Sequence, residues 1–146
     1  MLPQSKKWMI TGILVAVLPL AACSHNESHV AHAEHPSHVE AIAGSDMPKV
    51  TFTAKAMERT DVQTASVTTN SARGRTVVPY SSIIYDPQGN TWVYTSPEPR
   101  TFIRHHILVD RIEGNNVYLR EGPPAGTKVA SQGVAEIYGT EFEVGH

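Results

Sequence analysis

The residues with the clearest potential for chemistry are five of the eight histidines, which fall in one short stretch near the amino end. They are His25, His29, His32, His35 and His38. Neutral imidazole binds Zn, Cu and Ni, and histidine-rich tracts are a recognised metal-binding composition. However, Pro36 interrupts any helix through the tract, and no cysteine or paired carboxylate completes a coordination sphere. The tract therefore predicts either loose binding of Zn, Cu or Ni, or a soluble spacer that gains positive charge below pH ~6.5.

The only cysteine, Cys23, closes a segment that has the layout of an export signal. Lys6 and Lys7 supply positive charge, a largely apolar run covers residues 8–20, and two alanines precede the cysteine. The run is shorter than the ~20 residues that a membrane-spanning helix needs. In an exported protein, a lone thiol directly after such a signal has few uses other than modification.

The sequence LAAC, which ends at Cys23, resembles the lipobox of bacterial lipoproteins. The resemblance implies that residues 1–22 are a signal peptide and that the Cys23 thiol is fatty-acylated. The acyl chains would anchor the protein to a membrane, because each buried methylene contributes about 0.8 kcal/mol to membrane binding. The resemblance also implies that the anchored chain faces the periplasm. In the sorting system of Gram-negative bacteria, Ser24 after the cysteine favours the outer membrane over the inner one. The alternative is an ordinary signal with an incidental cysteine.

Composition divides the rest of the chain into two regions. Residues 23–48 contain few large apolar side chains, so they predict a disordered histidine-rich tether that reaches on the order of 25–30 Å. Residues 49–146 predict one domain. The formal net charge of -2 leaves no basic field for nucleic acid.

The region 49–146 is predicted to be mainly β, because short strand patterns recur between clusters of turn residues. Residues 86–90 carry Pro87 and Gly89 and join two such patterns into a hairpin over 82–94. Residues 54–60 predict one short helix with Thr53 as its N-cap. The other predicted strands cover residues 50–53, 62–69, 75–78, 101–110, 117–119 and 128–130. We expect a small antiparallel β-barrel or roll, with residues 138–146 as an exposed tail.

Several of these segments together resemble a known family. Val78-Pro79, the hairpin 85–94, Phe102, Arg104, residues 122–126, Val129, Gly133 and Ala135-Glu136 occur in an order similar to that in the membrane-proximal segment of periplasmic adaptors. These adaptors are the membrane fusion proteins of RND-type efflux pumps. Residues 49–67 (KVTFTAKAMERTDVQTASV) similarly resemble the segment that opens many of them.

The chain departs from the adaptors in what lies between those segments. Only eight residues separate Val67 from Thr76, so the lipoyl-like domain and the α-helical hairpin of a full adaptor are absent there. The resemblance implies a truncated adaptor that docks on pump or adaptor subunits in transmembrane export. Metal binding through the histidine tract is the alternative function.

Other chemistry has little support in the sequence. Trp92, Tyr94 and Phe102 lie on neighbouring predicted strands, as core residues or as an exposed partner-binding patch. His105 and His106 are adjacent, so on a strand they point to opposite faces and cannot share one ion. No phosphate loop, HExxH motif or glycine-flanked serine elbow occurs in the sequence. We expect no enzyme and no required cofactor.

Overall fold

A computed structural model describes residues 35–143 of the chain. The predicted signal peptide over residues 1–22 lies outside the described residues, and so does Cys23. The same holds for His25, His29 and His32, and for residues 144–146.

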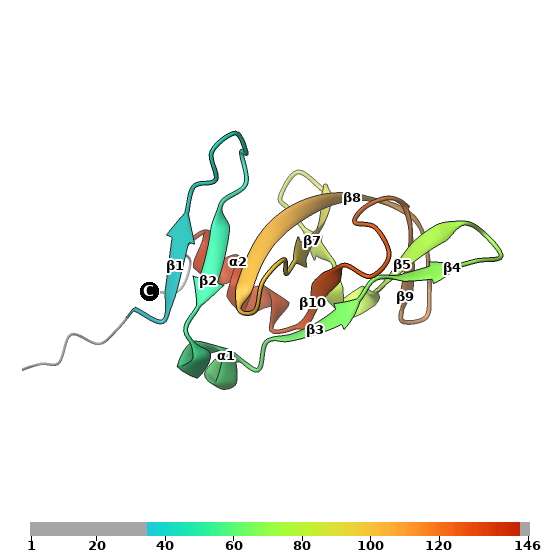
Figure 1. Cartoon of the computed structure of the whole chain (residues 1–146). Helices are drawn as coiled ribbons and strands as arrows, with labels where there is room; N and C mark the ends of the chain where they lie inside the picture. The colour runs from blue at the N-terminus through green and yellow to red at the C-terminus, as the bar shows by residue number, and fades with distance from the viewer. Residues whose placement is uncertain (1–34, 144–146) are drawn as a thin grey trace, which may run out of the picture. The chain divides into compact units, whose positions relative to one another are not determined.

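Strands dominate the described residues, as the sequence predicted, and two α-helices accompany them. In chain order the elements are β1 (Ser37–Glu40), β2 (Lys49–Phe52), α1 (Ala54–Thr60), β3 (Gln63–Ser66), β4 (Thr68–Asn70), β5 (Arg75–Pro79), the 3-10 helix η1 (Tyr80–Ser82), β6 (Ile84–Tyr85), β7 (Thr91–Thr95), β8 (Thr101–Glu113), β9 (Asn116–Glu121), β10 (Lys128–Gln132) and α2 (Val134–Glu141) (Figure 1). The predicted mainly β class is confirmed. Thr53 caps α1 as expected, since its hydroxyl accepts a hydrogen bond from the Ala56 amide at 3.1 Å.

The described strands pair antiparallel and follow the order β3-β10-β7-β8-β9-β5-β4. β2 pairs with β1 and β8, and β6 pairs with β7 in the predicted hairpin. β3 and β4 stand at opposite ends of this order, but only Val67 separates them in the chain. The sheet therefore curls into a half-barrel whose two ends are joined at Val67, where the predicted strand 62–69 is broken. Backbone hydrogen bonds of 2.8 Å tie Val67 to Thr127 and Gly126.

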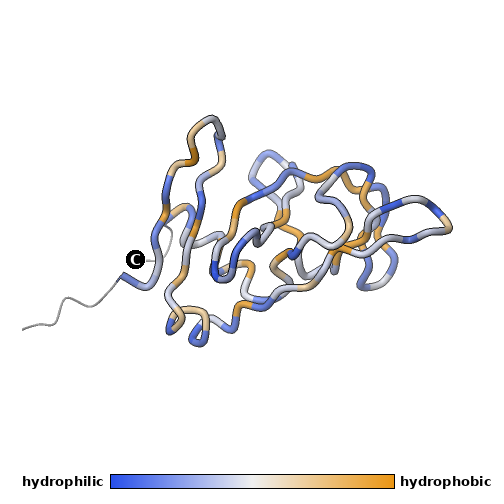
Figure 2. Tube along the Cα trace, viewed as in Figure 1, coloured by the Kyte–Doolittle hydropathy of each residue, from blue (hydrophilic) through white to orange (hydrophobic). Residues whose placement is uncertain are grey.

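Two apolar cores lie on opposite faces of the central strands. Val93 and Tyr94 are successive residues of β7 and point to opposite faces, yet both are 0% exposed. The helix-side core contains Val50, Phe52, Ala56, Val62, Tyr94, Phe102, Ala130 and Ile137, and the roll core contains Val67, Val78, Val93, Ile107, Val117, Leu119 and Val129. Along the Cα trace, hydrophobic residues concentrate on the central strands and hydrophilic ones in the turn between β6 and β7 (Figure 2). Because both faces of the central strands are covered, apolar and polar residues do not alternate along them.

The folded part begins earlier than the sequence predicted. Ser37–Glu40 form β1, which pairs with all four residues of β2. The Thr53 amide also donates to the Pro36 carbonyl at 2.9 Å, and Lys49 forms an exposed ion pair with Glu40 at 2.9 Å. The predicted disordered tether over residues 23–48 is thus wrong at Ser37–Glu40, because backbone pairing with β2 orders a polar segment that has no core of its own.

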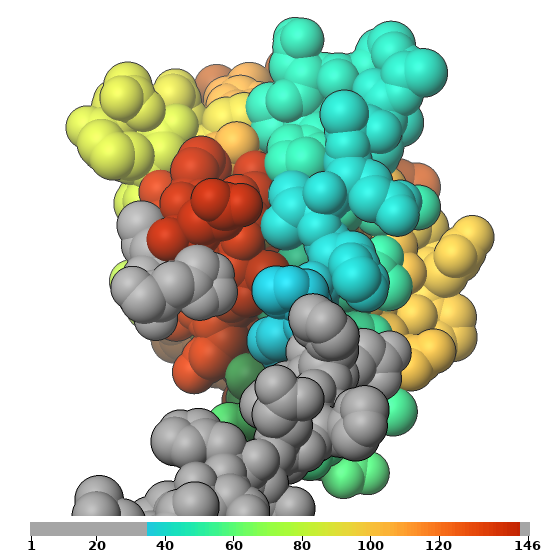
Figure 3. All heavy atoms as spheres, turned by 90° about the vertical axis from the view of Figure 1, so that its left-hand side faces the viewer, coloured from blue at the N-terminus to red at the C-terminus, as the bar shows by residue number. Residues whose placement is uncertain are grey.

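The second helix, α2, replaces part of the predicted exposed tail. Ile137 is 0% exposed and completes the helix-side core, with Val134 and Tyr138 packed beside it. In the space-filling view α2 (red) lies between the β1–β2 hairpin (cyan) and the turn after β6 (yellow-green) (Figure 3). The expectations of only one helix and of an exposed tail from residue 138 are therefore wrong, because apolar residues at helical spacing close the core.

Candidate functional site

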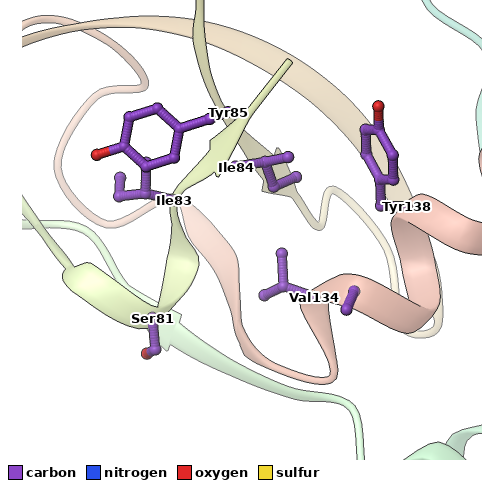
Figure 4. A pocket seen from close by; sticks show the side chains of 7 residues that line it. Ser81, Ile83, Ile84, Tyr85, Val134 and Tyr138 are labelled. Carbon is purple, nitrogen blue, oxygen red and sulfur yellow. The ribbon is translucent and has the colours of Figure 1, made fainter. Parts of the chain in front are cut away.

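An apolar groove lies between the η1–β6 segment and α2. It has a volume of about 460 Å³ and is lined by Ser81, Ile83, Ile84, Tyr85, Val134, Ala135 and Tyr138. Figure 4 shows the Ile84 and Val134 side chains between Tyr85 on one side and Tyr138 on the other. Most of the lining is aliphatic or aromatic, so the groove favours an apolar side chain over a charged ligand.

Exposed tyrosines lie at and beside the β6 wall of the groove. Tyr85 is 53% exposed and lines the groove. Tyr80, in η1 just before the first groove residue in the sequence, is 46% exposed. Burial of part of the Tyr85 side chain raises the pKa of its hydroxyl, and the neighbouring Tyr80 raises that pKa further. The Tyr85 hydroxyl thus stays neutral at physiological pH. Such side chains offer a large apolar ring together with a hydrogen-bonding group, which suits a protein interface.

A buried ion pair fastens the carboxyl end of α2 to β8. Arg104 Nε lies 3.1 Å from Glu141 Oε1, and the two side chains are only 11% and 2% exposed. The Tyr94 hydroxyl donates a hydrogen bond to the other carboxylate oxygen of Glu141. Burial raises the pKa of Tyr94, and the carboxylate of Glu141 raises it further, so the phenol keeps its proton.

Aromatic rings enclose the guanidinium of Arg104 in this ion pair. Its central carbon lies 4.5 Å from the centre of the Trp92 ring and 5.0 Å from that of Phe142. The Phe142 ring in turn packs at a tilt of 43° against Tyr138, with ring centres 4.6 Å apart, and Tyr138 lines the groove. We refer to Trp92, Tyr94, Arg104, Glu141 and Phe142 as the α2 latch. The latch holds the helix that forms one wall of the groove.

Asp86 holds the other edge of Trp92 in place. Its carboxylate accepts a hydrogen bond of 3.0 Å from the indole N–H of Trp92. It also accepts from the Asn90 side chain at 2.8 Å and from the backbone amides of Gln88 and Asn90. The Asn90 side chain is the largest cause that lowers the pKa of Asp86 to about 2, and Trp92 and the two amides add to it.

Asp86 should therefore make a pH-dependent contribution to folding. Its pKa lies below the ordinary 3.8, so the contribution is complete above pH ~4 and is lost as the pH falls through about 2. We expect the Trp92 indole N–H resonance to shift with a midpoint near pH 2, and Asp86→Asn to abolish that transition. A midpoint near pH 4 would show that these hydrogen bonds do not stabilise the carboxylate.

The structure separates the aromatic residues that the sequence grouped as a partner-binding patch. Tyr94 and Phe102 are 0% exposed and belong to the helix-side core, so the patch is wrong for both. Trp92 is half-buried between Arg104 and the edge of His106, whose ring centre lies 5.0 Å away. Tyr94 and Phe102 are buried because the two faces of the central strands are each covered by an apolar core.

The described histidines do not converge on a metal site. His35 and His38 are exposed, and His38 lies opposite Thr51 in the β1–β2 pair. His105 and His106 pair with Val93 and Trp92, so they point to opposite faces as predicted. Within residues 35–143, no three His, Cys, Asp or Glu side chains come together to hold an ion.

Local sequence patterns give little indication of the groove or the latch. Arg104 and Glu141 are 37 positions apart, and no local pattern connects a strand residue with one in a distant helix. Tyr85 is the one groove residue with a usable signal, since it is an aromatic residue directly before the turn 86–90.

Comparisons with known proteins leave the chain without a match: no family model fits it, and neither does any curated protein or solved structure. Over residues 35–143, no helix combines the length and apolar character that crossing a bilayer requires.

Proposed function

We propose that this chain is a lipid-anchored envelope protein that docks on a protein component of an RND-type export system. The observation that carries the proposal is the mostly apolar groove between the η1–β6 segment and α2, which has a half-exposed tyrosine, Tyr85, in one wall. An apolar side chain of a partner would fill the groove, and the tyrosine hydroxyl would hydrogen-bond at its rim.

The position of the groove supports this class of partner. One wall comes from the hairpin that contains Tyr85, and the other includes Ala135, two residues after Gly133. Both walls thus belong to segments that resemble the membrane-proximal part of periplasmic adaptors. In this proposal the adaptor-like segments are retained because they form the contact with a transport protein.

Docking of this kind requires no covalent chemistry. The groove offers hydroxyl groups from Ser81, Tyr85 and Tyr138, and its remaining lining is aliphatic. Acylation of Cys23 would hold the domain near the membrane and raise the local concentration of any membrane-bound partner, so a weak contact would suffice.

Substitution of Ala135 by arginine should weaken the docking. Ala135 is exposed on α2 and lines the groove, so the new side chain would place a charge against apolar surface. We expect recovery of transport components from envelope extracts to fall at least about tenfold, which corresponds to ~1.4 kcal/mol. Quantitative mass spectrometry after affinity capture of the full chain measures this.

Two controls accompany the capture experiment. Ala54→Arg adds the same charge to an exposed position of α1, away from the groove, and should leave recovery unchanged. Cys23→Ser should remove the acyl mass from the mature amino end and release the chain from the membrane fraction. Capture of no transport component by the unmodified chain, or equal capture by Ala135→Arg, would refute the proposal.

A further inference from the structure

The strand β6 forms an open edge of the sheet beside the groove. Among the described residues it pairs with β7 on one side and with no strand on the other. The Asp86 amide donates to the Asn90 carbonyl at 3.0 Å. Ile84 lies opposite Trp92. Hydrogen-bonded positions alternate along an antiparallel pair, so Ile84 and Asp86 bond to β7, whereas the N–H and C=O of Tyr85 point away from it.

The two outward backbone groups of Tyr85 are available to another chain. Over residues 35–143, neither the Tyr85 N–H nor its C=O takes part in a hydrogen bond. The Ile83 amide, the next one on this edge, is already bonded to the Tyr80 carbonyl at 3.1 Å. A strand edge with a free donor and a free acceptor is a template for pairing with an extended segment.

The groove runs along this edge, since its lining comes from both faces of the strand. Ile83 packs against the roll core and Ile84 against the helix-side core. Tyr85 points to the same side as Ile83, as Figure 4 shows, and all three side chains line the groove. A groove over one face of β6 would be lined by alternate residues only. The backbone of Tyr85 therefore borders the groove.

The free backbone groups determine which kind of segment fits the groove. A helix bonds its amides and carbonyls internally, so a helix packed there would bury the Tyr85 N–H and C=O without partners. An acyl chain would leave the same two groups unpaired. An extended segment pairs with both groups and places side chains against the apolar lining. Each group left unpaired on burial weakens binding by a factor of roughly five or more.

The lining also predicts a side-chain pattern for the segment. A residue paired with Tyr85 would point to the same side as Tyr85, and its neighbours would point to the other side. There they would meet Ile84, Val134 and Tyr138, which line the groove and pack against the helix-side core. The groove thus favours an extended segment with apolar residues at alternate positions.

Two other open edges in the described part of the sheet are polar. β1 and β4 each pair on one side only. Their sequences, SHVE and TTN, consist mostly of exposed polar residues. Polar side chains protect a strand edge against pairing with another chain. By contrast, β6 combines an open edge with an apolar groove.

We propose that the groove binds an extended segment of the partner protein, which adds a strand to β6 through the Tyr85 backbone and inserts an apolar side chain between Ile84 and α2. This inference rests on the groove being a docking site, as the proposed function requires, and it specifies the conformation of the docked segment.

Titration with synthetic peptides, followed by NMR of the isotope-labelled protein, tests the proposal. The protein is the exported form, residues 23–146 with Cys23→Ser, which contains both cores. The probes are three capped peptides with lysine at each end, in which threonine alternates with valine, leucine or phenylalanine. We expect at least one of them to give saturable shifts of the Tyr85 and Ala135 amides. An alanine-based helical peptide with the same apolar residue should bind more weakly.

N-methylation of the bound peptide isolates its backbone. The methylated peptide keeps the side chains but has lost its amide donors, so we expect it not to shift the Tyr85 amide. Three results would each overturn the proposal: no saturable shift with any extended peptide, shifts centred on β1 or β4, or equal binding of the methylated or helical peptide.

Two substitutions of Tyr85 isolate the other half of the contact. Tyr85→Pro removes an N–H that faces away from β7, a position where an edge strand tolerates proline. Tyr85→Val removes the ring but keeps the N–H. We expect Tyr85→Pro to bind the peptide at least about fivefold more weakly than Tyr85→Val, because the lost donor leaves a peptide carbonyl unpaired. Equal affinities of the two folded variants would refute the role of the amide. The methylated peptide tests the pairing in the unsubstituted chain as well, should Tyr85→Pro fail to fold.

The capture experiment distinguishes failure of this inference from failure of the docking proposal. Capture of transport components that Ala135→Arg abolishes, but that Tyr85→Pro and Tyr85→Val lower equally, would support docking and refute strand addition. Binding of the extended peptides without capture of any transport component would refute the export partner and support strand addition.

Discussion

Replacement of Glu141 by alanine should lower the free energy of unfolding by about 3–5 kcal/mol. The substitution removes the partner of Arg104, whose side chain is 11% exposed, and leaves that charge largely out of water. It also removes the acceptor for the Tyr94 hydroxyl, which is 0% exposed and has no other described acceptor. An unpaired buried charge and an unpaired buried hydroxyl are each costly. Urea denaturation of the variant and the parent measures the difference.

The exposed pair between Glu40 and Lys49 provides a matched control. Its atoms lie 2.9 Å apart, but the side chains are 59% and 37% exposed. Glu40→Ala should therefore lower the free energy of unfolding far less than Glu141→Ala does, because an exposed ion pair is screened by water. Similar losses in the two variants would show that burial of the Glu141 pair does not determine its effect.

A double replacement distinguishes the loss of the ion pair from the cost of leaving one buried charge unpaired. Arg104→Met with Glu141→Leu removes both charges together and should recover much of the stability that Glu141→Ala loses. Hydrogen exchange should show faster opening of α2 in Glu141→Ala than in the double variant. Because α2 forms one wall of the groove, the same comparison tests whether the latch maintains the groove.

Gly133→Ala should destabilise the protein by about 2–5 kcal/mol, the sum of a left-handed backbone cost and a clash. Gly133 precedes α2 with a φ of +68°, a conformation that side chains rarely adopt. A Cβ atom there would lie 2.6 Å from Val62 Cγ2, 2.9 Å from Val62 Cα and 3.0 Å from the Thr60 carbonyl oxygen. Two of these neighbours are backbone atoms, one in the last residue of α1 and one just after the helix, so the clash is not relieved by a side-chain rotation.

Gly89 separates the two contributions to this loss. It has a φ of +87° in the turn between β6 and β7, and a Cβ atom added there would have no neighbour within 4 Å. Gly89→Ala should therefore cost only the backbone term, about 1–2 kcal/mol. Thermal or urea unfolding of both variants checks this, and an equal loss at Gly89 and Gly133 would argue against the close approach of α2 to Val62.

Features that depend on neighbouring residues can be predicted from the amino-acid sequence without the tertiary structure. Asp86, Pro87 and Gly89 specify the turn of the β6–β7 hairpin, because Asp86 bonds to amides two and four residues later. Thr53 caps α1 through an amide three residues away. Short strand patterns between such turns are enough to predict a mainly β antiparallel fold.

Tertiary structure alone decided which surfaces are buried and which groups meet. Tyr94 and Phe102 are core residues because a helical layer and a curled sheet cover opposite faces of β7 and β8, which alternation along one strand does not reveal. The polar segment Ser37–Glu40 is a strand only because the edge of β2 is there to pair with it. Arg104 meets Glu141 because the chain folds α2 back onto the sheet. The burial of Tyr94 and Phe102 and the pairing of Arg104 with Glu141 join residues that are distant in the chain, so their free energy comes from desolvation and pairing that exist only after the sheet has curled.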